Sequence, residues 1–188
     1  MKKISIGIII LLVVGGAVWF YQQKGGVGTE ANDPKNATYV IDNRPVKLVN
    51  GYAETEVAPG SASKTITKYF GNELKADLDG DGREDVAFII TQESGGSGVF
   101  YYAVAALNKP EGYVGSDAYL LGDRIAPQST NLSTNPKHKN VVVFNFADRA
   151  QGEPMSASPS VGKSVYLKIG SDSRWGVVVP NFEGESNR

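Results

Sequence analysis

The chain has 188 residues, 41% of them hydrophobic, which allows one ordinary domain with a real core and a short additional segment. Its formal charge is -1. Three of the 19 basic residues, Lys2, Lys3 and Lys24, fall in the N-terminal segment, which leaves 16 basic against 20 acidic residues. This mildly acidic balance argues against nucleic acid or an anionic lipid surface as a partner. The absence of cysteine excludes disulfides, zinc-thiolate sites and thiol catalysis.

The N-terminal segment has the composition of a membrane anchor. An uncharged stretch of about 20 residues follows the Lys2–Lys3 pair, and a stretch of this length spans a bilayer. The lysine pair favours an N-terminus in the cytoplasm, and the aromatic residues at 19–21 suit the membrane-water interface. A cleaved signal peptide is the alternative, because small residues at 15–17 follow an apolar run. Either alternative places the rest of the chain outside the cytoplasm.

These patterns predict four regions. We expect a transmembrane signal anchor at 1–23, a flexible polar and glycine-rich linker at 24–36, an extracytoplasmic β-rich domain at 37–183 and a short tail at 184–188. The predicted location is therefore the cell membrane, with a single span and the domain outside the cytoplasm. The predicted fold class is mainly β, an antiparallel meander or sandwich-like domain preceded by one N-terminal transmembrane helix.

Strand signals dominate from residue 38 onward, where the hydrophobic period is mostly two. Asn50-Gly51 is the strongest short hairpin signal in the chain. Residues 63–70 fit either a strand or one face of a helix, and we favour the strand. A long loop rich in Pro, Ser and Gly is predicted at 148–163. The other predicted strands cover residues 73–78, 86–91, 99–107, 140–147, 164–169 and 175–179.

Two of these strands are apolar on both faces, at 86–91 and 99–107. Strands of this kind lie at the centre of a sheet and are covered on each side. Because the connections between 73–78, 86–91 and 99–107 are short, we expect the three strands to form an antiparallel meander.

An acidic loop between the first two strands of this meander carries the sharpest motif. Its sequence is Asp-Leu-Asp-Gly-Asp-Gly-Arg-Glu-Asp over residues 77–85. Calcium is a hard cation that takes six to eight oxygen ligands, and carboxylates at alternate positions converge if the chain curls. Gly82 permits the sharp turn that this requires. The predicted ligands of one calcium ion are the carboxylates of Asp77, Asp79, Asp81 and Asp85 and the backbone carbonyl of Arg83.

The acidic loop does not fit an EF-hand, because the twelfth position is Phe88 instead of glutamate. It resembles the calcium hairpin of integrin-type FG-GAP repeats, with Phe70-Gly71 as the opening pair and residues 77–85 as the loop. The closing Gly-Ala-Pro of those repeats is absent. The resemblance covers about 20 residues and implies a calcium-binding strand-loop-strand unit, and not a propeller, which requires several four-stranded blades.

The whole domain also resembles a family of uncharacterised, exported, membrane-anchored bacterial proteins. That resemblance implies no activity. It is carried by residues 71–73, 95–98, 122–128 and 159–164.

Several patterns look catalytic but lack the context that their mechanisms need. Gly162-Lys163-Ser164 fits the loosest form of a P-loop, but a β-branched run follows where a helix is required, so we expect no nucleotide. Residues 61–64 and 160–163 fit S-x-x-K without the companion elements of serine acyl-enzymes. His138 lies in a polar turn beside two lysines, which indicates a solvated position.

Paired carboxylates remain a further possibility, since two acids can hydrolyse a glycan. The candidates outside the acidic loop are expected to be solvated or paired with arginine; they are Glu93, Asp117, Asp123 and Asp148.

The sequence thus leaves three classes of function. We favour a calcium-binding β-domain that acts as a binding or structural module at the cell surface, with a protein or glycan partner that the sequence does not identify. An extracytoplasmic hydrolase acting on cell-wall glycan or peptide is the first alternative. An accessory subunit of an envelope complex is the second.

Overall fold

A computed structural model describes residues 32–179 of the chain. The predicted anchor at 1–23 and tail at 184–188 lie outside the described residues, as does most of the predicted linker at 24–36. Within residues 32–179, no helix is both long enough and apolar enough to cross a membrane. The only helical element described there is a short 3-10 turn, η1 (Pro34–Asn36).

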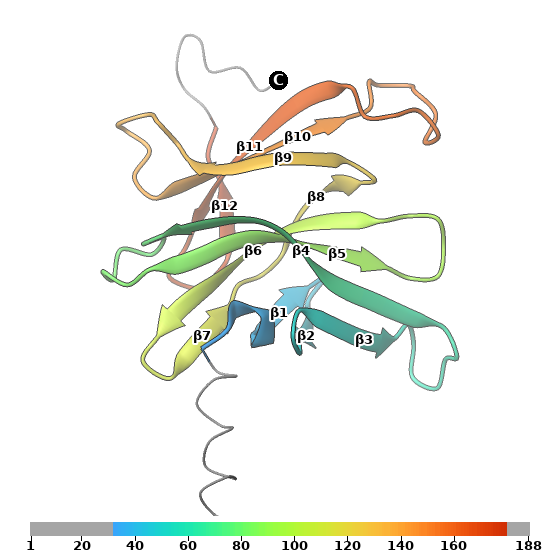
Figure 1. The fold of residues 1–188 in the computed structure, drawn as a ribbon, viewed down its shortest axis with the longest axis horizontal. Coiled ribbons are helices and arrows are strands. Elements are labelled where there is room, and N and C mark those ends of the chain that lie inside the picture. The colour runs from blue at the N-terminus through green and yellow to red at the C-terminus, as the bar shows by residue number, and fades with distance from the viewer. Residues whose placement is uncertain (1–31, 180–188) are drawn as a thin grey trace, which may run out of the picture.

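The described part of the chain is mainly β, as expected, and its sheets are antiparallel (Figure 1). The strands are β1 (Thr38–Ile41), β2 (Arg44–Lys47), β3 (Tyr52–Glu56), β4 (Lys64–Ala76), β5 (Asp85–Glu93), β6 (Phe100–Lys109), β7 (Gly112–Gly115), β8 (Tyr119–Asp123), β9 (Ala126–Leu132), β10 (Val141–Asp148), β11 (Val161–Ile169) and β12 (Trp175–Val177).

The largest sheet contains the predicted meander. Its strand order is β3-β4-β5-β6-β7, with β8 also paired to β6. The ambiguous segment at 63–70 and the predicted strand at 73–78 form one long strand, β4, whose register with β5 shifts on both sides of Gly71. Such irregularities bend a strand and increase its twist without ending it.

The second sheet has four strands in the order β12-β11-β10-β9 and packs against one face of the six-stranded sheet (Figure 1). Alternate residues of β5 and β6, among them Ala87, Ile89 and Ala105, meet Phe144 and Leu167 of the second sheet in one hydrophobic cluster. This cluster forms the core between the two sheets, where buried apolar area stabilises the fold.

The opposite face of β5 and β6 is covered by the β1–β2 hairpin, and η1 lies beside β7. Val86, Phe88 and Ile90 of β5 are buried there with Tyr39 of β1 and Leu48, which follows β2, in a second cluster. The prediction of cover on both sides is confirmed for residues 86–91 and 102–107, because β5 and β6 contribute to both clusters. It does not hold at the start of β6, where Phe100 is exposed.

Backbone contacts fix the β1–β2 hairpin on the sheet. The amide of Val40 donates to the carbonyl of Ser116 at 3.1 Å, and the amide of Ala118 donates to the carbonyl of Val40 at 2.8 Å. A Cβ at Gly115 would lie 2.3 Å from the carbonyl oxygen of Thr38, so this close approach of β7 to β1 requires glycine. Strand β1 of the hairpin is therefore held against β7 and the residues that follow it.

The Asn50-Gly51 signal marks a real turn but not a long hairpin. Both residues have positive φ, and Val49 and Tyr52 exchange two backbone hydrogen bonds across the turn. The chain then diverges, because β2 pairs with β1 while β3 pairs with β4. The extended hairpin instead turns at Asp42 and Asn43, which also have positive φ.

The later strands agree with expectation at 140–147, 164–169 and 175–179, where β10, β11 and β12 lie. Strand β9 has no clear signal in the sequence, because it is polar and contains Pro127. It lies at the edge of the four-stranded sheet, which is where a strand tolerates proline.

Candidate functional site

The acidic loop connects β4 to β5 and is organised by the carboxylate of Asp77. One oxygen of Asp77 accepts from the amides of Gly80 at 2.7 Å and Asp81 at 3.1 Å, and the other accepts from the amide of Gly82 at 3.0 Å. Gly80 and Gly82 have φ values of 85° and 84°, which other residues rarely adopt. These two glycines let the chain curl around the Asp77 carboxylate.

Three of the predicted ligands lie together. Asp77, Asp79 and Asp85 each offer a carboxylate oxygen, and these oxygens all lie within 4.8 Å of one another. Oxygens bound to one calcium ion at about 2.4 Å are at most about 5 Å apart. The spacing and the oxygen chemistry of these three residues therefore fit a calcium ion.

Asp85 is the buried member of this group. It is fully buried at the start of β5, and its two oxygens accept from the amides of Leu78 at 2.9 Å and Asn108 at 2.8 Å. Burial raises the pKa of its carboxyl, and the charges of Asp79 and Asp81 act in the same direction, while the two amide hydrogen bonds oppose the shift. Asp85 thus joins the acidic loop to the end of β6.

Asp81 stands apart from the three, because it faces two cations. Its Oδ2 accepts from Lys109 Nζ at 2.8 Å and from Arg83 Nη2 at 2.5 Å. The hydrogen bond from Lys109 is the largest cause of the lowered pKa of Asp81. The ligand role predicted for Asp81 would require these contacts to rearrange.

Arg83 was expected to contribute its backbone carbonyl, and that remains a prediction. Its side chain spans the loop, because Nε donates to the carbonyl of Asn108 at 2.5 Å while Nη2 contacts Asp81. The guanidinium therefore ties the loop to β6 beside the contact that Asp85 makes there.

Lys109 is the residue of this site that sequence reasoning missed. Its ammonium group contacts Asp79 as well as Asp81, and both hydrogen bonds raise its pKa. Lys109 is the last residue of β6, which pairs with β5. This pairing brings Lys109 to the loop although it is 30 residues from Asp79 in the sequence. The sequence signal for this contact was Asn108-Lys109-Pro110-Glu111-Gly112, a turn pattern that ends the strand paired with β5.

The segment with the loose P-loop pattern is a strand. Gly162, Lys163 and Ser164 lie in β11, which begins at Val161, three residues earlier than predicted. Lys163 forms an ion pair with Asp148 at 2.7 Å, and Ser164 donates to Asn145 at 2.7 Å. These side chains join β11 to β10. The chain continues as a strand to Ile169, where a P-loop would begin a helix.

His138 is half-buried in the turn between β9 and β10. Its Nδ1 lies 2.8 Å from the hydroxyl oxygen of Ser133, and its ring meets Tyr166 edge-on. The Ser133 hydroxyl also accepts from the amide of Asn135 at 3.3 Å. His138 is therefore packed against Ser133 and Tyr166, and does not have the solvated position expected from the sequence.

The four other candidate acids each lie beside a cation. The pairs are Glu93 with Lys68 at 3.4 Å, Asp117 with Arg174 at 3.2 Å, Asp123 with Arg124 at 2.9 Å and Asp148 with Lys163 at 2.7 Å. Burial raises the pKa of Asp123 and Asp148, but their cations and backbone amides outweigh it and the net pKa is lowered. A general acid needs the opposite shift.

Comparison of the chain with protein-family models, with curated proteins and with solved structures gave no match.

Proposed function

We propose that this chain is a membrane-anchored, extracytoplasmic β-domain that binds one calcium ion in the acidic loop and acts as a binding or structural module at the cell surface. The observation that supports it is the convergence of carboxylate oxygens from Asp77, Asp79 and Asp85 within 4.8 Å. Asp81 and the carbonyl of Arg83 are the further ligands of the proposal.

The position of the acidic loop would make calcium a stabiliser of the fold. The loop joins β4 to β5, and Asp85 and Arg83 connect it to the end of β6. An ion there would neutralise carboxylates that otherwise repel one another and would hold three neighbouring strands. Ligand binding to the folded state alone adds to its free energy of unfolding.

A second candidate is favoured by the contacts of Lys109. Its ammonium group already lies against Asp79 and Asp81, and Arg83 adds a second cation. The loop would then be an acidic turn neutralised by its own side chains, and calcium would add nothing.

Thermal unfolding of the purified protein separates the two candidates. A calcium dissociation constant of about 10⁻⁴ to 10⁻³ M suits an extracellular module. About 5 mM calcium would then add roughly 1 to 2.3 kcal/mol to the free energy of unfolding. For a domain of this size the melting temperature should rise by about 2 to 8 °C over that in EDTA. Magnesium should substitute poorly, because it prefers a smaller, octahedral shell.

Asp79→Ala should remove most of the calcium-dependent rise, because it deletes a ligand. Asp172→Ala is the matched control, since Asp172 is an exposed acid near β12, outside the acidic loop. Identical melting curves in EDTA and in calcium would reject the calcium site and leave the neutralised turn. An equal calcium effect in Asp79→Ala and wild type would show that calcium binds somewhere other than the acidic loop.

A further inference from the structure

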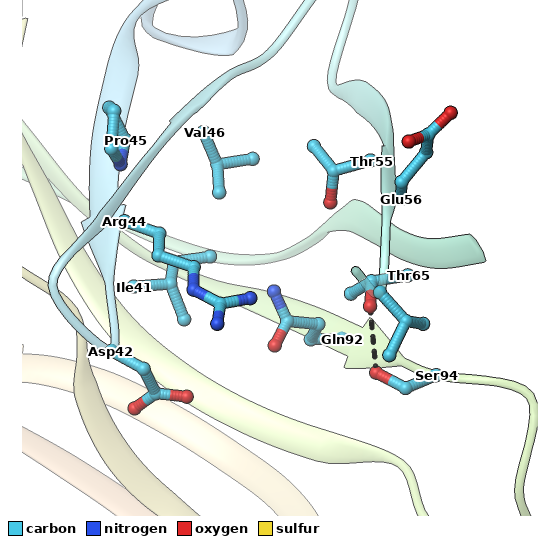
Figure 2. A pocket seen from close by; sticks show the side chains of 11 residues that line it. Ile41, Asp42, Arg44, Pro45, Val46, Thr55, Glu56, Thr65, Gln92 and Ser94 are labelled. Carbon is cyan, nitrogen blue, oxygen red and sulfur yellow. Dashed lines mark hydrogen bonds between the residues drawn. The ribbon is translucent and has the colours of Figure 1, made fainter. Parts of the chain in front are cut away.

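A hollow of about 420 Å³ opens between the β1–β2 hairpin and the ends of β3, β4 and β5 (Figure 2). Its volume falls within the range of small-molecule sites. It lies at the end of β5 opposite the acidic loop, because Gln92 lines the hollow and Asp85 belongs to the loop. Seven residues of strand place the two roughly 23 Å apart.

The floor of the hollow continues the sheet face that is buried under the β1–β2 hairpin. Along β5 the inward side chains change from apolar Phe88 and Ile90 to polar Gln92. The amide nitrogen of Gln92 donates to the hydroxyl of buried Thr67 at 3.3 Å, which fixes its orientation. The carbonyl oxygen of Gln92 and one amide hydrogen remain available to a ligand.

Hydroxyl groups complete this floor. Thr55 of β3 and Thr65 of β4 are direct partners across the strand pair, so their side chains lie on one face. The Thr65 hydroxyl lies 3.0 Å from that of Ser94, and Figure 2 shows the pair at the edge of the hollow. Hydroxyls act as both donors and acceptors, and the floor therefore suits a ligand rich in polar groups.

Arg44 supplies a cation above the floor. It begins β2, and Figure 2 shows its guanidinium extending into the hollow toward Gln92. Among the described residues, its side chain has no ion pair or hydrogen-bond partner.

The two acids that line the hollow form hydrogen bonds with groups other than Arg44. Glu56 accepts from the amide of Gly60 at 2.9 Å, and Asp42 lies 3.5 Å from the hydroxyl of Tyr102. Neither carboxylate forms an ion pair with Arg44 within the described chain. The guanidinium is thus a fork of free donors that matches the geometry of a carboxylate.

We propose that this hollow binds a small carboxylate-bearing ligand. The carboxylate pairs with Arg44, and hydroxyl or amide groups of the ligand hydrogen-bond to Gln92 and the threonines. The apolar part of the ligand rests on Pro45 and Val57, two exposed side chains of the wall. A sugar acid and a free peptide C-terminus share this chemistry. The site is distinct from the acidic loop and does not depend on calcium.

The test is an NMR titration of the ¹⁵N-labelled protein in EDTA with two carboxylates, D-glucuronate and acetyl-alanyl-alanine. Uncharged counterparts, D-glucose and acetyl-alanyl-alanine amide, accompany them. We expect at least one carboxylate to shift the backbone amides of residues 41–46, 55–57 and 92–94 in a saturable way, with its uncharged counterpart binding at least about tenfold more weakly. The probe that binds identifies the source of the carboxylate.

Arg44→Gln should weaken that binding by about tenfold or more, because it removes the charged fork from an exposed position without disturbing the core. Arg174→Gln is the matched control, since Arg174 lies in the turn before β12 and does not line the hollow. The proposal is overturned by no saturable shift up to about 50 mM of either carboxylate. It is equally overturned by shifts at other residues, or by equal affinity in Arg44→Gln and wild type. Because the titration is run in EDTA, its result is independent of whether calcium binds the acidic loop.

Discussion

At the scale of single residues, the ammonium group of Lys109 balances the charge of the acidic loop. It lies against Asp79 and Asp81, and Asp79 also belongs to the cluster with Asp77 and Asp85. Any cation bound by that cluster would share Asp79 with Lys109. The lysine and the proposed calcium ion therefore compete for one carboxylate.

Lys109→Gln should raise the affinity of the loop for calcium by about fivefold, because it removes a competing positive charge from partly exposed carboxylates. It should also lower the melting temperature in EDTA, since Asp79 would lose its ion pair and Asp81 would keep only Arg83 as a counter-ion. Isothermal titration with calcium measures the first effect, and thermal unfolding in EDTA measures the second.

Lys75→Gln is the control for this change, because it removes the same charge from an exposed side chain of β4, on the strand that leads into the loop. It should alter calcium affinity much less than Lys109→Gln. An unchanged or weaker affinity in Lys109→Gln would show that the lysine does not compete with calcium.

At the scale of the element, β5 joins the three layers of the domain. It contributes Ala87 and Ile89 to the core between the sheets and Phe88 to the core under the β1–β2 hairpin. The Phe88 ring meets Tyr39 edge-on at 5.6 Å and lies 5.3 Å from the ring of Tyr69. The acidic loop and the hollow lie at the two ends of this strand, so a rigid β5 positions both.

Phe88→Ala should lower the free energy of unfolding by about 3 to 5 kcal/mol, because it leaves a cavity between two layers. Denaturant unfolding in EDTA measures this loss. Phe70→Ala is the control, because Phe70 on the neighbouring strand is 44% exposed and its loss should cost about 1 kcal/mol. Similar losses in the two variants would contradict the three-layer core.

At the scale of the whole molecule, three β layers stabilise a domain without disulfides. The chain contains no cysteine, and two hydrophobic clusters on opposite faces of β5 and β6 provide its core. A domain held in this way is stable in an oxidising or a reducing compartment, so its fold is compatible with the proposed location outside the cytoplasm.

Export is expected from the uncharged N-terminal stretch and the Lys2–Lys3 pair. Protease added to intact cells or spheroplasts should digest the domain, and N-terminal sequencing of the membrane form should begin near Met1. A mature form that starts near Val18 would replace the anchor with a cleaved signal peptide. A domain protected from added protease would contradict export.

Much of the strand arrangement follows from the sequence alone, because it depends on local periodicity. The continuous apolar runs at 86–91 and 99–107 predict two central strands, and β5 and β6 are buried on both faces. The spacing of aspartate and glycine at 77–85 predicts a curled acidic loop, since close residues determine how such a loop turns. These features need only side-chain pattern and turn chemistry.

The remaining features were decided by the tertiary structure, because they depend on residues that are distant in the chain. Strand pairing brings Lys109 to Asp79, and packing of the β1–β2 hairpin on the sheet brings Arg44 to Gln92. The polar strand β9 forms because β10 offers it a partner along one edge, although its own sequence contains Pro127. A single sequence gives the preferences of each segment, but contacts between distant segments determine which charges meet and where a hollow opens.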